Sequence, residues 1–117
     1  MGLIYKICSA SEWRDAEAAG AFAGAAVDLR DGFIHFSTGS QVEETASRHF
    51  AGRPDLVLVA VAAERLGDAL RWEPSRGGAL FPHLYGVLPV SAAERVHPLG
   101  LGPDGRHVFP ALPDGGG

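Results

Sequence analysis

The sequence predicts an α+β domain in which two main helices pack against a small, mostly antiparallel sheet. In residues 33–37 the apolar Ile34 and Phe36 point to one face and the more polar set of Phe33, His35 and Ser37 to the other, as in a half-buried strand. Residues 56–61 form a continuous apolar run, which indicates a strand buried on both faces. At 117 residues, with no internal repeat or linker, the chain is expected to form one domain over residues 1–112 and a frayed tail at 113–117.

The N-terminal third is predicted to contain a strand, a helix and a loop. Residues 3–8 are β-branched and aromatic, which favours a strand. Ser9 or Ser11 can then cap a helix over residues 11–20. Residues 20–32 contain several glycines and little periodicity, so they predict a loop that covers part of the molecule.

The middle of the chain is predicted to continue with a strand, a helix and the buried strand described above. In the strand at residues 33–37, His35 and Ser37 point to the same face. Ser40 stands at capping-box spacing before a helix over residues 41–50. A Gly-Arg-Pro sequence ends this helix, and the doubly buried strand follows it.

After residue 62 the chain alternates short extended segments with turns. We expect a turn or helical piece at residues 64–67, followed by a strand at 70–73 and a loop at 77–78. An extended segment is expected at residues 81–86, and either a helix start or a strand within 91–98. Pro82 lacks a backbone donor, so the segment that contains it is expected to be an edge strand or a bent strand.

Composition and charge exclude several classes of function. The net charge is −4 and the ten basic residues are scattered, so a duplex nucleic acid is not an expected partner. The longest apolar run, residues 56–63, is far shorter than the roughly 20 residues that span a bilayer, and residues 1–20 show no secretion signal. Cys8 is the single cysteine, which excludes an intrachain disulfide and a cysteine-based zinc site. We therefore expect a cytoplasmic protein with no membrane partner.

Two polar segments carry chemistry that a hydrophobic core does not require. The first is residues 31–38, and the second is residues 71–86, which crowd polar and aromatic side chains around a Gly-Gly break. A small-molecule site needs a few convergent polar groups on a rigid frame, and the prolines and glycines of the second segment supply such a frame. We therefore predict one pocket that the side chains of His35 and His83 both face.

The same two segments resemble a known family. Residues 31–38 read Asp-Gly-Phe-Ile-His-Phe-Ser-Thr, and residues 70–86 read Leu-Arg-Trp-Glu-Pro-Ser-Arg-Gly-Gly-Ala-Leu-Phe-Pro-His-Leu-Tyr-Gly. With residues 41–52 between them, these strings resemble the small bacterial family called domain of unknown function 952, and the match covers roughly residues 3–99. That family has no settled activity.

The family in turn resembles the ADP-ribosyltransferase superfamily on a smaller scale. That superfamily includes the RNA 2′-phosphotransferases. Those enzymes hold NAD or an ADP-ribosylated intermediate in a cleft between two small antiparallel sheets. Residues 5–8 would stand at the superfamily's first motif, with Lys6 in place of its histidine, and residues 36–38 at its Ser-Thr motif. The resemblance implies an ADP-ribosyltransferase-like fold of two small, mostly antiparallel sheets that form a cleft with flanking helices. It also implies NAD or another nucleotide-derived compound as the ligand.

Within this frame we expect His35, Glu73 and His83 to be the catalytic residues. An imidazole can bind a ribose hydroxyl or a phosphate oxygen, or move a proton near neutral pH, and a carboxylate can bind ribose or stabilise positive charge. The expected ligand-binding residues are Ser37, Thr38, Arg76 and Tyr85. Among them, Arg76 is expected to bind a phosphate group of the ligand.

Each of these residues also has an ordinary structural explanation. His35 fits a half-buried histidine bonded to a backbone carbonyl, Glu73 fits a surface ion pair, and Tyr85 fits aromatic packing. Two alternative functions therefore stay open. One is a non-catalytic module that binds a ligand or a partner. The other is a metal-dependent hydrolase in which His35, His83 and Glu73 hold the metal, although their spacing is not that of a ligand motif and no metal is assigned.

Overall fold

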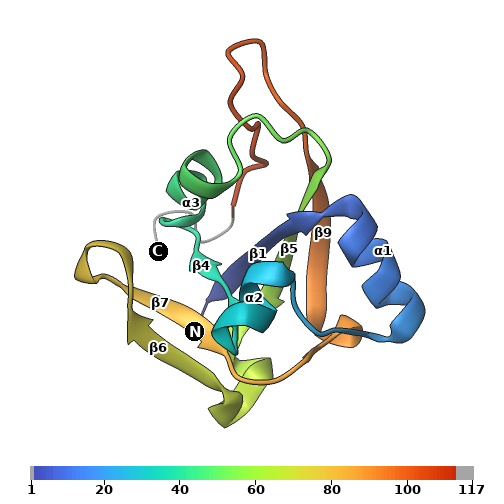
Figure 1. The fold of residues 1–117 in the computed structure, drawn as a ribbon, viewed down its shortest axis with the longest axis vertical. Coiled ribbons are helices and arrows are strands. Elements are labelled where there is room, and N and C mark those ends of the chain that lie inside the picture. Colours follow the sequence, from blue (N-terminus) through green and yellow to red (C-terminus); the bar gives the residue numbers. More distant parts are fainter. Residues whose placement is uncertain (1, 113–117) are drawn as a thin grey trace.

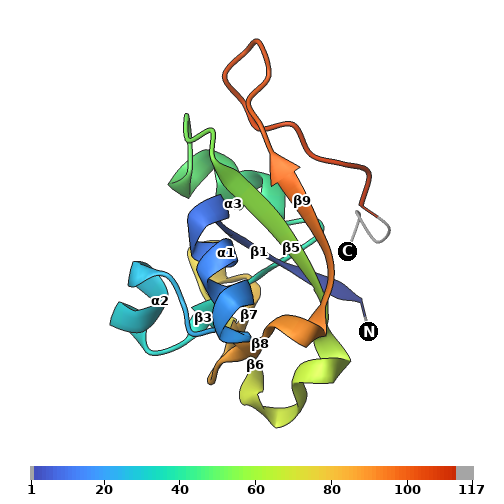
Figure 2. The same cartoon turned by 90° about the vertical axis from the view of Figure 1, so that its right-hand side faces the viewer.

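The computed structural model describes residues 2–112, and the expected tail at residues 113–117 lies outside them. The described chain forms an α+β fold in which all paired strands are antiparallel (Figure 1, Figure 2). This confirms the predicted class and is incompatible with a doubly wound parallel sheet. No helix within residues 2–112 has the length and apolar character needed to cross a membrane.

The described residues form three sheets. The largest has the strand order β4 (Ser37–Thr38), β1 (Leu3–Ser9), β5 (Leu56–Ala62) and β9 (Ala93–Leu99). The second has the order β3 (Ile34–His35), β7 (Leu80–Leu84) and β6 (Leu70–Pro74), and the third pairs β2 (Ala21–Phe22) with β8 (Leu88–Pro89). The helices are α1 (Ala10–Ala19), α2 (Ala26–Asp31) and α3 (Val42–His49), and the 3-10 turns are η1 (Ala63–Ala69), η2 (Arg76–Gly78) and η3 (Val90–Ala92).

The four-stranded sheet is buried on both faces, because alternate residues of its central strands enter two separate apolar clusters. On one face, Val59 and Val61 of β5 join a cluster that includes residues of α1, β3 and β7. On the other face, Leu58 and Ala60 join a cluster that includes residues of α3. The prediction that β5 is buried on both sides is confirmed, and the sheet is the core on which the site is built.

Helix α1 begins at the first of the two candidate serines. The Oγ of Ser9 accepts a hydrogen bond from the N–H of Glu12 at 3.0 Å, and the N–H of Ser9 donates to the Glu12 carboxylate at 2.8 Å. This reciprocal capping box starts the helix at Ala10, one residue earlier than expected. Gly20 ends it in the left-handed conformation, with φ at 87°.

The expected loop over residues 20–32 is wrong, since this segment contains β2 and α2. Helix α2 has only six residues, and its N-cap is Ala25, whose side chain cannot accept a hydrogen bond. Asp28, inside the first turn, instead accepts the N–H of Ala25 at 2.8 Å. The helix therefore lacks the residue signal by which a helix start is recognised in a sequence.

The expected strand over residues 33–37 divides into two strands that belong to different sheets. β3 pairs with β7, and β4 pairs with β1. Between them, Phe36 donates its N–H to the C=O of Pro82 at 3.0 Å, but Pro82 has no N–H to return. The ladder with β7 ends there and the chain joins the other sheet. Ser37 therefore leaves the sheet that carries His35, contrary to the prediction.

The same proline lies in a central strand and not in the expected edge or bent strand. β7 runs between β3 and β6. Pro82 is tolerated because its nitrogen faces the short strand β3, whose pairing consists of Ile34 with Leu84 and His35 with His83.

Helix α3 lacks the expected capping box. Its N-cap is Gln41, whose side chain makes no capping bond and instead accepts the N–H of Thr38 at 3.0 Å. The hydroxyl of Ser40 lies 3.1 Å from that of Thr38. These side chains stabilise the turn before the helix and not its first turn.

Candidate functional site

The two polar segments of the sequence meet at a pair of histidines. His35 in β3 and His83 in β7 are direct partners across the two strands, and their ring centroids are 5.6 Å apart. Directly opposed residues on adjacent strands project from the same face of a sheet. The structure thus brings the two segments together as the sequence predicts.

Aromatic rings surround the histidine pair. Phe33 stacks on His83 with the ring centroids 4.1 Å apart, and its ring lies 4.6 Å from that of His35 and 5.2 Å from that of Tyr85. Stacked and tilted rings at these distances attract one another. We call Phe33, His35, Glu73, His83 and Tyr85 the histidine cluster.

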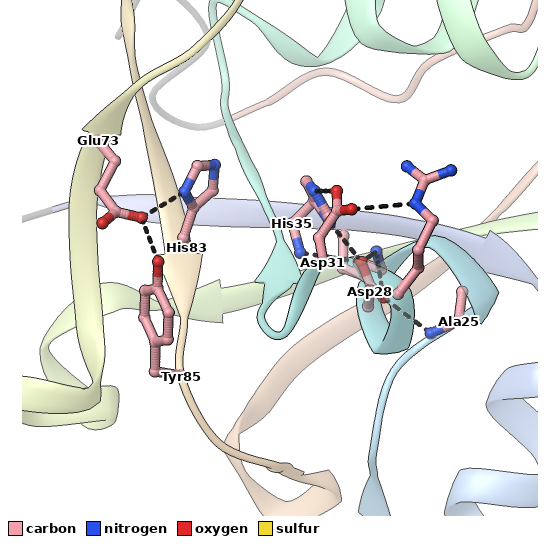
Figure 3. A network of polar contacts seen from close by, with 9 residues as sticks. Ala25, Asp28, Asp31, His35, Glu73, His83 and Tyr85 are labelled. Carbon is pink, nitrogen blue, oxygen red and sulfur yellow. Dashed lines mark hydrogen bonds and ion pairs between the residues drawn. The ribbon is translucent and has the colours of Figure 1, made fainter.

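Glu73 joins the cluster through one carboxylate oxygen. Its Oε1 lies 2.7 Å from Nδ1 of His83 and accepts the hydroxyl of Tyr85 at 2.8 Å (Figure 3). The hydrogen bond from His83, followed by that from Tyr85, holds the pKa of Glu73 below its usual value. The same carboxylate raises the pKa of the Tyr85 hydroxyl.

His83 has one occupied and one open ring nitrogen. An ionised carboxylate only accepts hydrogen bonds, so Nδ1 of His83 donates to Glu73, and the tautomer that this bond selects has Nε2 as its acceptor nitrogen. Within the described part of the chain, Nε2 has no hydrogen-bond partner. The His83 side chain is 7 % exposed. An imidazole held in one tautomer by a carboxylate, with its second nitrogen open, is equipped to exchange a proton with a bound molecule.

His35 is held by carboxylates on both sides. Its Nδ1 lies 2.6 Å from Oδ1 of Asp28, and its Nε2 lies 3.0 Å from Oδ2 of Asp31 (Figure 3). With a carboxylate oxygen within 3.0 Å of each of its ring nitrogens, His35 has no nitrogen left for a ligand. The geometry therefore favours a structural role for His35 over the expected catalytic one.

Asp28 is the buried centre of this network. The residue is 2 % exposed, and its two carboxylate oxygens lie 2.8 and 3.0 Å from Nζ of Lys6. It also accepts the backbone N–H groups of Ala25 and His35, at 2.8 and 3.1 Å. Burial by itself would raise the pKa of Asp28, but the hydrogen bond from His35 and the charge of Lys6 outweigh it and lower the pKa to about 2.

Asp28 and Asp31 are the site residues that sequence reasoning missed, because both fall in the segment expected to be a loop. One signal does point to such a partner. Lys6 alternates with Ile4 and Cys8 on the face of β1 that enters the core, and it is 3 % exposed. A buried ammonium needs a counter-charge, so a lysine at this position predicts a buried carboxylate without saying which one.

The other predicted ligand-binding residues make their described contacts elsewhere. The hydroxyl of Ser37 is buried and lies 2.9 Å from that of Thr45 in α3. Thr38 contacts Ser40 in the turn before the same helix. The side chain of Arg76 lies outside the described part of the structure.

A metal centre gains no support from the geometry. Within residues 2–112, no three histidine, cysteine or acidic side chains are grouped as a metal ion would require. Both nitrogens of His35 face carboxylates, so the alternative site with His83 and Glu73 lacks its third ligand. Burial raises the pKa of the Cys8 thiol to about 12, so this residue is a small apolar side chain and not a nucleophile.

A hollow of about 380 Å³ lies away from these residues. It is lined by α3 and the C-terminal segment, through Glu43, Glu44, Ala46, Ser47, Ala51, Gly105, Arg106, His107 and Phe109. None of its lining residues belongs to the histidine cluster, so this hollow is not the pocket expected at His35 and His83.

Comparison with known proteins places this small α+β fold and its polar cluster in a family. The family model described as "Protein of unknown function (DUF952)" matches residues 7–96, and the chain belongs to that family. This confirms the resemblance read from the two polar segments. The match shows no link between this chain and the ADP-ribosyltransferase superfamily.

Solved structures of one bacterial protein match the chain. The crystal structure of protein CC0527 from Caulobacter crescentus shares 57 % identity, with the match covering 91 % of this chain and 93 % of that chain at a TM-score of 0.88. The solution NMR structure of CC0527 also shares 57 % identity, covers 91 % of each chain and has a TM-score of 0.82. Neither description names an activity or a ligand. No curated protein matches the chain.

Proposed function

We propose that this protein is a small acid–base catalyst that acts on a polar small molecule, with His83 as the proton-transferring group. The observation that carries the proposal is the state of its ring, whose Nδ1 is bonded to Glu73 while Nε2 is open among the described residues. General acid–base catalysis needs one nitrogen within reach of the substrate and a second nitrogen that fixes the tautomer.

Glu73 and Tyr85 position this base. When Nε2 takes a proton from the substrate, positive charge develops on a ring whose Nδ1 lies 2.7 Å from the Glu73 carboxylate, which stabilises that charge. Tyr85 donates to the same oxygen and so holds the orientation of the carboxylate. Phe33 stacks on His83 and limits the access of water, which strengthens the pair.

The ligand class that we propose is NAD or another nucleotide-derived compound, bound on an ADP-ribosyltransferase-like fold. The support is the resemblance of residues 5–8 and 36–38 to motifs of that superfamily, together with the rim of the cluster. The partly exposed rings of Phe33 and Tyr85 offer faces on which a base can stack. Arg71, whose guanidinium lies 5.1 Å from the Tyr85 ring centroid, offers a charge for phosphate.

Lys6 changes how such a ligand would be held. It stands where the superfamily often has a histidine, and its ammonium is buried against Asp28. In this proposal the contacts therefore come from β6 and β7 instead of the first strand.

Binding and turnover test the proposal separately. Titration of ¹⁵N-labelled protein with ADP-ribose and with NAD is expected to give saturable shifts of the amide signals of Phe33, His83 and Tyr85. Release of nicotinamide from NAD is expected to fall about 10²–10⁴-fold in His83→Gln, the range that a general acid or base contributes. No shift with either ligand would remove the nucleotide class, and an unchanged rate in a folded His83→Gln would remove the catalytic role.

A non-catalytic binding module is the second candidate. The observation in its favour is that two expected site groups, His35 and Ser37, are bonded inside the protein, as is Lys6 at the position of the superfamily's first motif. This candidate expects saturable binding of ADP-ribose by the wild type, no release of nicotinamide, and little loss of affinity in His83→Gln.

A further inference from the structure

β6 is an edge strand with an exposed aromatic residue at its centre. It is the outermost strand of the order β3, β7, β6 and runs along the outer margin of the molecule (Figure 1). Trp72 is 46 % exposed, and Leu80, opposite the end of β6, is 52 % exposed. An open strand edge that carries large apolar side chains is a template for pairing with another strand.

Two backbone hydrogen bonds define the ladder between β6 and β7. Tyr85 donates to the C=O of Ala69 at 2.8 Å, and Ser75 donates to the C=O of Ala79 at 2.9 Å. Both bonds continue the register of the hairpin, from Leu70 opposite Leu84 to Pro74 opposite Leu80, by one residue at either end. Hydrogen-bonded pairs alternate in an antiparallel ladder, so every second residue of β6 bonds inwards.

The remaining residues of β6 turn their backbone groups away from the sheet. These are Leu70, Trp72 and Pro74. The N–H of Leu70 is already bonded to the C=O of Gly67, and Pro74 has no N–H. Trp72 is therefore the one position of β6 that offers both a donor and an acceptor outwards. Pairing at this edge is confined to a short stretch around it.

We propose that the protein forms a two-fold symmetric dimer through antiparallel pairing of β6 with β6 of a second copy, centred on Trp72. In this arrangement the N–H of each Trp72 donates to the C=O of the partner's Trp72. The two indole rings lie side by side on one face, where aromatic cross-strand pairs are favourable. The blocked positions at both ends stop the pairing from continuing into a longer assembly.

Charge selects this register over its neighbours. With Trp72 opposite the partner's Trp72, Arg71 lies opposite the partner's Glu73, and Glu73 lies opposite the partner's Arg71. Shifting the centre by one residue places arginine against arginine or glutamate against glutamate, which is destabilising. Directly opposed residues between hydrogen-bonded pairs have their Cα atoms about 4.5 Å apart, so these side chains meet.

The pairing also reaches the histidine cluster. Arg71 and Glu73 share the face of the hairpin that carries His83. His83 and Tyr85 both contact Oε1 of Glu73, which leaves Oε2 towards the partner's Arg71. Each site would then have an arginine from the second copy at its rim. The dimer itself does not depend on the proposed function, although any effect of that arginine on a ligand does.

Sedimentation equilibrium over about 10 µM to 1 mM protein tests the dimer, a range suited to a weak interface. The average mass is expected to rise from 12.3 kDa towards twice that value. Arg71→Glu is expected to weaken association at least about tenfold, because it opposes like charges at both contacts. Arg95→Glu, the same change on the exposed strand β9, is the matched control and is expected to have no effect. A mass of 12.3 kDa throughout overturns the proposal.

A complementation experiment identifies the interface. Arg71→Glu and Glu73→Arg are each expected to be monomeric, and an equimolar mixture is expected to dimerise, since acid faces base at both contacts only in the mixed pair. In the wild type, where folding is not at issue, exchange of the Trp72 amide is expected to slow as protein concentration rises. The inward amides of Arg71 and Glu73 serve as the reference. Association with no change in the exchange of Trp72 contradicts this pairing.

Discussion

Because Lys6 and Asp28 form a buried ion pair, removing the charge of Lys6 is expected to destabilise the folded protein. The two groups lie 2.8 Å apart, with side-chain exposures of 4 % and 1 %. Lys6→Met keeps the length of the chain and leaves Asp28 buried without its cation, which costs about 3–5 kcal/mol in comparable cases. We expect a loss near the lower end of that range, because Ala25 and His35 still donate to Asp28. Urea unfolding measures it.

Arg48→Met is the matched control for this prediction. Arg48 forms an ion pair with Glu44 at 2.7 Å on α3, but the two side chains are 54 % and 56 % exposed. Solvent-exposed pairs contribute up to about 1 kcal/mol, so the control is expected to lose less than that. Equal losses in both variants would show that burial adds nothing to the Lys6 contact.

Asp28 also makes the free energy of unfolding depend on pH in acid. Its pKa is about 2 in the folded protein against 3.8 for the free group, so folding favours the ionised form. The contribution is fully present above about pH 4 and is lost as the pH falls from about 4 to about 2. The difference in pKa corresponds to about 2 kcal/mol.

Urea unfolding of the wild type and Asp28→Asn at pH 5, 4, 3 and 2 isolates this contribution. Other carboxylates with a lowered pKa, such as Asp31 and Glu73, are common to both proteins. The wild type is expected to lose its advantage over Asp28→Asn across this range. A stability difference that is independent of pH would contradict the assignment.

At the scale of elements, the entry into α2 leaves no room for a side chain at Gly24. Its φ is 125°, and a Cβ there would lie 2.9 Å from the Cβ of Asp28. At the far end of the helix, Gly32 has φ 88° and open space around it. Gly24→Ala therefore meets both strain and a collision, whereas Gly32→Ala meets strain alone. We expect Gly24→Ala to cost at least about 1 kcal/mol more in thermal unfolding. Similar losses of stability in Gly24→Ala and Gly32→Ala would mean that Asp28 can move away from the new methyl group without a measurable cost.

Elements whose signal is local could be predicted from the sequence, and elements that depend on distant partners could not. The β-branched and aromatic residues of β1 predict a strand, and the continuous apolar run of β5 predicts burial on both faces. Helix α2 gives no such signal, because its first turn is stabilised by Asp28, which is in turn held by Lys6 from another strand. The break at Phe36 likewise depends on Pro82, which belongs to a strand far along the chain.

The same distinction applies to the candidate site. The meeting of His35 and His83 follows from two unusual segments that share a family resemblance. The structural role that the geometry favours for His35 does not, because it requires knowing that two carboxylates of an unrecognised helix face its ring. The open nitrogen of His83 is visible only once Glu73 is placed.

At the scale of the whole molecule, the four-stranded sheet is expected to outlast the hairpin formed by β6 and β7. β5 has a paired strand on each side and an apolar cluster on each face. Among the described residues, the strand pairing of the hairpin with the rest of the protein runs through β3 only, by two residue pairs. Native-state hydrogen exchange of dilute protein in rising urea is expected to show β6 amides opening at a lower free energy than β5 amides. One common opening energy would show instead that both sheets unfold together.

The network around Asp28 also has a consequence for how the family can change over generations. Lys6, Asp28 and His35 come from separate stretches of the chain, and the buried charges of Lys6 and Asp28 are each tolerated because the other is present. A lineage that loses the lysine alone inherits an uncompensated buried charge, and one that loses the aspartate alone inherits an uncompensated ammonium. Single replacements should therefore be purged, and these positions should be inherited together or exchanged together. Relatives with an apolar residue in place of Lys6 are expected to have lost the acid at Asp28 as well.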